Sequence, residues 1–180
     1  SRGMASIAMR TIETAIDTEP NNPEAWRLLA IAANSRGTIP VPLKFANTCI
    51  KLQPKDPQSH TTLATAYRLN GDIDKALVCY DQAMSINPSF PEAIAGKAEV
   101  LESIGRTEEA EILLTNSPST DSVLVALAKV RIARKLNKPD RALQAIDSVM
   151  NQQLSPYHLS NLNMHRGRVL EELSRYDDAW

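Results

Sequence analysis

Histidines and cysteines are the residues of this 180-residue chain whose types suit metal binding or nucleophilic catalysis. The histidines are His60, His158 and His165, and the last two lie seven residues apart, about two helical turns. A catalytic zinc needs three protein ligands, and this pair lacks a third. A cysteine nucleophile needs a histidine partner, and the sequence places none beside Cys49 or Cys79. We therefore expect no catalytic residue, no metal site and no cofactor in this chain.

The remaining chemically suggestive residues have a structural explanation that we favour. The acidic pairs Glu108-Glu109, Glu171-Glu172 and Asp177-Asp178 could bind a cation, but carboxylates also stabilise helix N-termini and cover solvated faces. Free cysteine packs like a small hydrophobic residue, so we expect Cys49 and Cys79 to face the interior.

Composition excludes several classes of protein. The chain has 20 basic and 21 acidic residues, so no excess charge favours nucleic acid or an anionic membrane surface. It contains no apolar run of about 18 residues, the length of a membrane-spanning helix. Two cysteines are too few for a disulfide framework, and we expect a cytoplasmic location.

A period of 34 residues organises the chain. The residues that share this period are Gly37, Gly71 and Gly105; Pro20, Pro54 and Pro88; and Pro23, Pro57 and Pro91. Within one period the unit reads Leu63, Ala64, Tyr67, Gly71, Ala76, Tyr80, Ala83 and Pro88. This pattern resembles the tetratricopeptide repeat family, whose unit is a helix–turn–helix of about 34 residues. The resemblance implies an all-α fold, a right-handed α-solenoid of antiparallel helix pairs.

The period predicts one domain of about five repeats, with the first and last incomplete. The predicted units are about 5–20, 23–54, 57–88, 91–119, 121–155 and 157–180. Pro42 predicts a late start for the second helix of its unit, and residues 116–120 should end another second helix about a turn early. Asn137 takes the glycine position of its unit. Because Trp180 falls inside an expected helix, we expect a fragment of a longer protein.

The resemblance implies a groove, lined by the first helix of each unit, that binds an extended peptide or a helix. The corresponding groove candidates are Arg27, Asn34, Thr61, Thr65, Arg68, Glu99, Glu102, Arg131, Arg134 and Arg168. We therefore predict a non-catalytic protein–protein interaction scaffold with a protein or peptide partner, and a homodimer stays open. His60 falls in the position of Trp26, which indicates a packing role. The carboxylate clamp known in this family needs Lys and Asn where this chain has Arg27 and Ile31, so we do not expect that function.

Charged residues of two neighbouring units invite two interpretations. Glu99 and Glu102 occupy one turn of the third full unit, and Arg131 and Arg134 occupy the equivalent turn of the fourth. They could form ion pairs between repeats, which we favour, or the arginines could form a basic pocket for a carboxylate of a partner.

A further departure from the pattern concerns a position that holds leucine in the earlier units. Leu29 and Leu63 are replaced there by Lys97, Lys129 and Arg166 in the later units. The aliphatic stems can still pack while the charges reach outward, or the superhelix is irregular at these points.

An alternative function follows from the end of the chain. The run from Gly167 to Trp180 resembles the last repeat before the catalytic domain of bacterial tetratricopeptide sulfotransferases. That resemblance implies an accessory or dimerisation region of a larger transferase, whose catalytic domain would follow residue 180.

Overall fold

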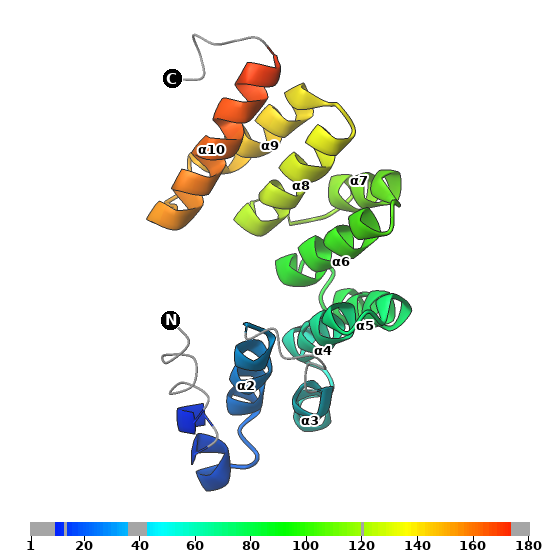
Figure 1. Cartoon of the computed structure of the whole chain (residues 1–180), viewed down its shortest axis with the longest axis vertical. Helices are drawn as coiled ribbons and strands as arrows, with labels where there is room; N and C mark the ends of the chain where they lie inside the picture. Colours follow the sequence, from blue (N-terminus) through cyan, green and yellow to red (C-terminus); the bar gives the residue numbers. More distant parts are fainter. Residues whose placement is uncertain (1–9, 13, 36–42, 120, 174–180) are drawn as a thin grey trace. The chain divides into compact units, whose positions relative to one another are not determined.

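The structure of the chain is a computed structural model that describes residues 10–12, 14–35, 43–119 and 121–173. Of residues 33–35 only the backbone is described. All regular structure in these residues is helical (Figure 1). The chain divides into two compact units, Ser1–Gly96 and Lys97–Trp180, and the boundary falls within one helix, α6 (Pro91–Ser103).

The first unit contains helical residues 10–12 and 14–18, followed by complete helix pairs. These helices are α2 (Pro23–Ser35), α3 (Leu43–Leu52), α4 (Pro57–Leu69) and α5 (Ile73–Ile86). Helix α3 packs against both α2 and α4, and α4 packs against α5. The description of α3 begins at Leu43, and Gly37, Pro40 and Pro42, on which the predicted late start of this helix depends, lie outside the described residues.

The second unit begins within α6 (Pro91–Ser103) and is also built from packed helices. Its further helices are α7 (Thr107–Thr115), α8 (Val123–Lys135), α9 (Pro139–Met150) and α10 (Pro156–Glu172). Helix α8 packs against α7, α9 and α10, and α9 packs against α10. The predicted all-helical class built from packed helix pairs is therefore confirmed. Tyr176, Ala179 and Trp180 lie outside the described residues.

Three left-handed residues end the first helices of their pairs. Gly71, Gly105 and Asn137 have φ angles of 83°, 81° and 54°. In each case the next residue donates its N–H to the carbonyl five positions earlier, at 2.8–2.9 Å, as in a Schellman cap. The prediction that Asn137 replaces a glycine is confirmed, since Asn tolerates this conformation better than most other side chains.

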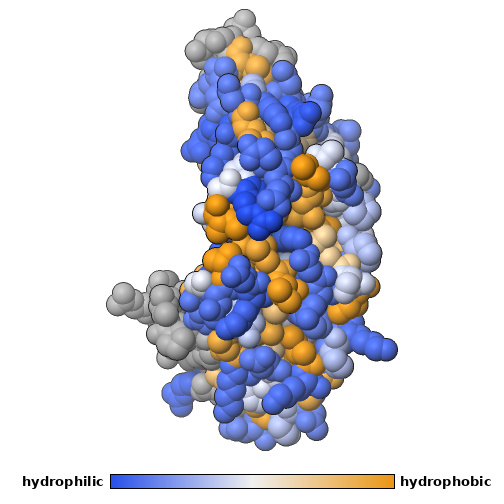
Figure 2. All heavy atoms as spheres, turned by 90° about the vertical axis from the view of Figure 1, so that its right-hand side faces the viewer, coloured by the Kyte–Doolittle hydropathy of each residue, from blue (hydrophilic) through white to orange (hydrophobic). Residues whose placement is uncertain are grey.

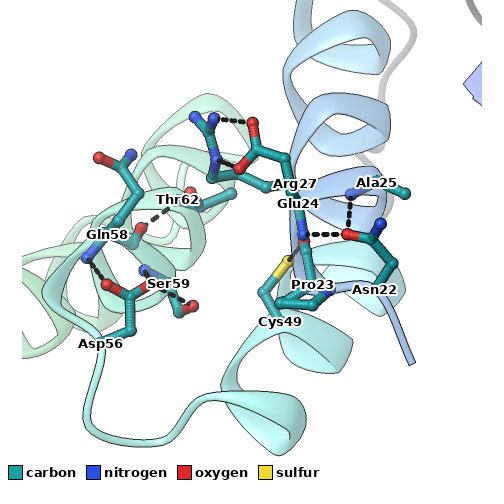
Figure 3. Close-up of polar contacts among 10 residues, drawn as sticks. All are labelled: Asn22, Pro23, Glu24, Ala25, Arg27, Cys49, Asp56, Gln58, Ser59 and Thr62. Atoms are coloured by element: carbon teal, nitrogen blue, oxygen red, sulfur yellow. Dashed lines mark hydrogen bonds and ion pairs between the residues drawn. The ribbon is translucent and has the colours of Figure 1, made fainter.

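Equivalent side chains begin α2 and α4, and they lie 34 residues apart. Asn22 accepts hydrogen bonds from the N–H groups of Glu24 and Ala25, at 3.1 and 3.3 Å. Asp56 accepts from Gln58 and Ser59, at 3.2 and 2.9 Å (Figure 3). The first N–H groups of a helix have no partner within the helix, so both caps stabilise the helix start.

Each unit has its own apolar interior. In the first unit Leu29, Ala30, Ala64 and Tyr80 are at most 2% exposed. In the second unit the buried cluster of α8, α9 and α10 includes a set of fully buried side chains, Val130, Ile146, Val149, Leu162 and Val169. These residues recur at helical spacing, so burial of one stripe of each helix stabilises the pairs.

Helix α7 is short, as the sequence predicts. It has nine residues and ends at Thr115, whereas α5 has 14. Asn116 caps it by donating its N–H to the Ile112 carbonyl. Pro118 follows two residues later and cannot donate a backbone hydrogen bond, so the helix does not continue.

Candidate functional site

The groove candidates of the first unit are mostly engaged in local contacts. The Arg27 Nε donates to Glu24 at 2.7 Å, and this contact lowers the pKa of the Glu24 carboxyl (Figure 3). Thr61 is only 6% exposed, and its hydroxyl donates to the Pro57 carbonyl. Thr65 lies 3.3 Å from the Tyr80 hydroxyl. Arg68 is partly buried in the last turn of α4, and the side chain of Asn34 lies outside the described residues.

The second unit brings charged residues of three helices together. The Arg131 Nε donates to Glu102 of α6 at 2.5 Å, and the Lys135 ammonium lies 3.7 Å from the same carboxylate. Arg134 binds Glu172 of α10 through Nε and Nη2, at 3.0 and 2.5 Å. The predicted ion pair between Glu102 and Arg131 is thus present, whereas Arg134 binds a residue that the sequence did not suggest. Glu99 lies partly buried one turn before Glu102.

His165 of α10 lies within the same group of charges. Burial lowers its pKa, and the positive charges of Arg134, Arg168 and Arg131 lower it further. Its Nδ1 is buried and has no hydrogen-bond partner among the described residues. Burial first, and the neighbouring positive charges second, thus favour the neutral form of the imidazole. We call Arg131, Arg134 and Lys135 of α8 with His165 and Arg168 of α10 the α8/α10 face.

Arg168 is the cation of the α8/α10 face that stays uncompensated. It is exposed, and in the described part of the chain it forms no ion pair or hydrogen bond. Apolar side chains share this face, because Leu124 lies two turns before Arg131 and Met164 one turn before Arg168. Leu124 is 40% and Met164 is 48% exposed. The arrangement offers cations and apolar contacts to a ligand.

The sequence analysis did not place His165 or Glu172 among the groove candidates. A signal was present, since they are seven residues apart with Arg168 between them, which places all three on one side of α10. Their proximity to α8 could not be read from this spacing, because it depends on how α8 and α10 pack.

Groups that could support covalent or metal chemistry are buried or isolated. Cys49 is 1% exposed, its thiol lies 3.7 Å from the Pro23 carbonyl, and burial raises its pKa to about 11 (Figure 3). Burial also raises the pKa of Cys79. His60 is 9% exposed and lies against Gln82 and the Pro54 carbonyl. Within the described ranges no three His, Cys, Asp or Glu side chains are grouped to hold a metal ion.

No helix among the residues described is both long and apolar enough to cross a bilayer. Figure 2 shows one face of the molecule, on which hydrophobic residues lie in small groups among hydrophilic ones.

Comparisons with known proteins agree with this architecture. Residues 57–90 match the family model of the tetratricopeptide repeat (TPR). The chain is similar to TTC0263, a thermophilic TPR protein of Thermus thermophilus, with 21% identity and a TM-score of 0.75 over 95% of this chain and 91% of that one. It is similar to PilW, a type IV pilus biogenesis factor, with 15% identity and a TM-score of 0.71 over 99% and 83% of the two chains.

A third similar structure is YrrB, described as a TPR protein with an unusual peptide-binding site. Its identity is 14% and its TM-score 0.56, over 96% of this chain and 88% of that one. No curated protein matches the chain. At these identities the similarities establish the fold alone, and the family model that matches is a repeat rather than a catalytic domain.

Proposed function

Because residues 57–90 form a tetratricopeptide repeat and the chain has the fold of such repeat proteins, we propose that it is a non-catalytic scaffold that binds an acidic segment of a partner protein on its α8/α10 face. The observation that supports this proposal is the uncompensated Arg168 beside His165, Arg131 and Arg134. An anion supplied by a partner would complete the charge balance of this surface.

The arginines suit recognition of carboxylates. A guanidinium presents its N–H groups in a planar fork that matches a carboxylate, and such charge-assisted bonds are about twice as strong as neutral ones. Glu102 and Glu172 already occupy part of Arg131 and Arg134 in this way. These internal carboxylates restrict the two arginine side chains, which reduces the conformational entropy that is lost when a ligand binds them.

Apolar contacts would add to the affinity. The exposed Leu124 and Met164 lie beside the cations, and Tyr157 in the first turn of α10 is 73% exposed. Trp, Tyr and Arg side chains contribute much of the binding energy at protein interfaces, whereas charged residues at the rim set the rate and specificity of association. We therefore expect the partner segment to combine acidic and apolar residues.

The test is selection of displayed random peptides on the immobilised chain, followed by titration of the selected peptides. We expect peptides with Asp or Glu beside an apolar residue, bound with about micromolar affinity that falls as salt is raised. Arg168→Glu should weaken the binding of these peptides about tenfold or more.

A matched control is Lys44→Glu, which changes the net charge equally at an exposed position of α3. This variant should bind the selected peptides like the unaltered chain. Selection of basic or neutral peptides, or equal loss of affinity in both variants, would contradict the proposal.

A further inference from the structure

A cleft lies on the other side of α8, between α7, α8 and α9. Its volume is about 370 Å³. The lining residues are Glu111, Leu114, Thr115, Lys129, Ile132, Ala133, Arg141, Gln144, Ala145 and Ser148. Lys129 and Arg131 are two residues apart, which turns their side chains about 200° from each other around the helix. The cleft is therefore separate from the α8/α10 face.

Two departures from the repeat pattern meet in this cleft. The first is the short α7, whose last residue, Thr115, lines the cleft. A helix as long as α5, with 14 residues instead of nine, would continue past this point. Lys129 lines the cleft from the position where Leu29 and Leu63 are 2% and 6% exposed core residues. A lysine here thus stands partly buried beside Leu114, Ile132 and Ala145.

Lys129 differs from the other charged residues at the leucine position. Arg166 lies 3.9 Å from Asp147, and the charge of Lys97 helps to lower the pKa of the Glu109 carboxyl. Lys129 has no ion pair or hydrogen bond within the part of the chain that the structure describes. A cation without a counter-ion on the protein remains available to an anionic ligand.

The carboxylate inside the cleft is already bound. The Lys138 ammonium lies 2.6 Å from Glu111 Oε2, and Arg141 lies 2.5 Å from Glu111 Oε1. These contacts, together with burial that acts in the opposite direction, leave the pKa of the Glu111 carboxyl below its ordinary value. Glu111 is held by these two cations and forms no ion pair with Lys129. The residues that line the cleft therefore carry an excess of positive charge, because Lys129 and Arg141 outnumber Glu111.

We propose that this cleft binds a small amphipathic carboxylate, with its carboxylate on Lys129 and its apolar group against the uncharged residues that line the cleft. The volume falls in the range of small-molecule sites, about 300–1,000 Å³, and suits one apolar group the size of a phenyl ring with a short acid chain. An ammonium–carboxylate bond would supply the counter-ion that Lys129 lacks among the described residues. The proposal is independent of peptide binding on the α8/α10 face.

The test uses 4-phenylbutyrate as the probe and the neutral 4-phenylbutan-1-ol as its isostere. Titration of the whole chain, followed by amide NMR shifts and calorimetry, should show the acid binding with shifts on α7, α8 and α9. The alcohol should bind about 10- to 100-fold more weakly, since it lacks the charge-assisted contact. Equal binding of the two compounds, or shifts confined to other helices, would overturn the proposal.

Lys129→Leu is the decisive variant, because leucine occupies this position in α2 and α4 and folding should be preserved. It should reduce the affinity for the acid to that for the alcohol. Lys97→Leu makes the same change outside the cleft and should bind the acid like the unaltered chain. Retained binding of the acid by Lys129→Leu would overturn the proposal. The peptide acetyl-Gly-Gly-Phe is a second probe. If it bound more tightly than 4-phenylbutyrate and its binding required Lys129, the cleft would be a site for a polypeptide C-terminus, and the proposal would also be overturned.

Discussion

Trp26 and His60 form the same hydrogen bond in consecutive repeats. The Trp26 Nε1 donates to the Pro20 carbonyl at 2.8 Å, and the His60 Nε2 lies 2.8 Å from the Pro54 carbonyl. Both contacts span six residues, and the two rings lie 34 residues apart. A carbonyl only accepts, so His60 must bear a proton on Nε2. Each contact ties the first helix of its pair to the chain that precedes it.

We expect His60→Phe to lower the free energy of unfolding by about 1–3 kcal/mol, since the Pro54 carbonyl loses its donor. His60→Trp should lower the free energy of unfolding less, because the indole N–H of Trp26 makes the same contact in the preceding repeat. Urea unfolding of the two variants measures the difference. Equal losses would mean that ring packing, rather than the hydrogen bond, is what this position requires.

The caps of α2 and α4 predict which substitutions Asp56 tolerates. Asp56→Asn should be nearly neutral, because Asn22 makes the same contacts with the first N–H groups of α2. Asp56→Ala should cost about 0.5–2 kcal/mol, since two N–H groups of α4 lose their acceptor. Thermal unfolding provides the comparison. Asp72→Ala is the control, because the Asp72 side chain does not cap α5, and a loss as large as that of Asp56→Ala would argue against capping.

Gly96 should not accept alanine, although alanine normally stabilises a helix relative to glycine by about 1 kcal/mol. A Cβ at this position would lie 2.6 Å from Tyr80 Cε1 and 2.7 Å from the Tyr80 hydroxyl oxygen. Because Tyr80 is 1% exposed, a shift of its ring would disturb its buried neighbours, so we expect the free energy of unfolding to fall by about 1–3 kcal/mol. In a Tyr80→Leu background, Gly96→Ala should lower the free energy of unfolding much less. An unchanged loss in that background would rule out the Tyr80 ring as its cause.

The lowered pKa of His165 predicts a dependence of stability on pH. The ordinary value is 6.5, and burial with the neighbouring arginines lowers it in the folded chain. Below that ordinary value, His165 takes up a proton in the unfolded chain but not in the folded chain. The contribution of His165 to the free energy of unfolding is therefore lost as the pH falls. Between about pH 7.5 and about pH 5.5, the melting temperature of His165→Gln should therefore fall less than that of the unaltered chain.

Arg134→Gln provides a second measurement on the same group, because the charge of Arg134 lowers the pKa of His165 more than that of Arg168 or Arg131 does. Its removal should raise the pKa of His165, as followed by NMR of the imidazole protons. An unchanged pKa would show that the arginine is not close to the ring.

The path of the backbone could largely be predicted from residue types and their period. Gly71, Gly105 and Asn137 end helices where the 34-residue spacing and its shorter last step place them. Residues 116–119 end α7 early, and Pro156 begins α10. Each of these features depends on backbone conformation within a few neighbouring residues, and so it can be read from a short stretch of sequence.

Residue types and their spacing therefore specify where helices begin and end and which stripe of each is buried. Which charges meet depends instead on how the helices pack: Arg131 binds Glu102, Arg134 binds a carboxylate 38 residues away, and Lys129 binds none within the described residues. The physical reason is that ion pairs form over a few ångströms between side chains of different helices. A small change in the angle or distance between two packed helices changes these separations without changing the local pattern that specifies the helices.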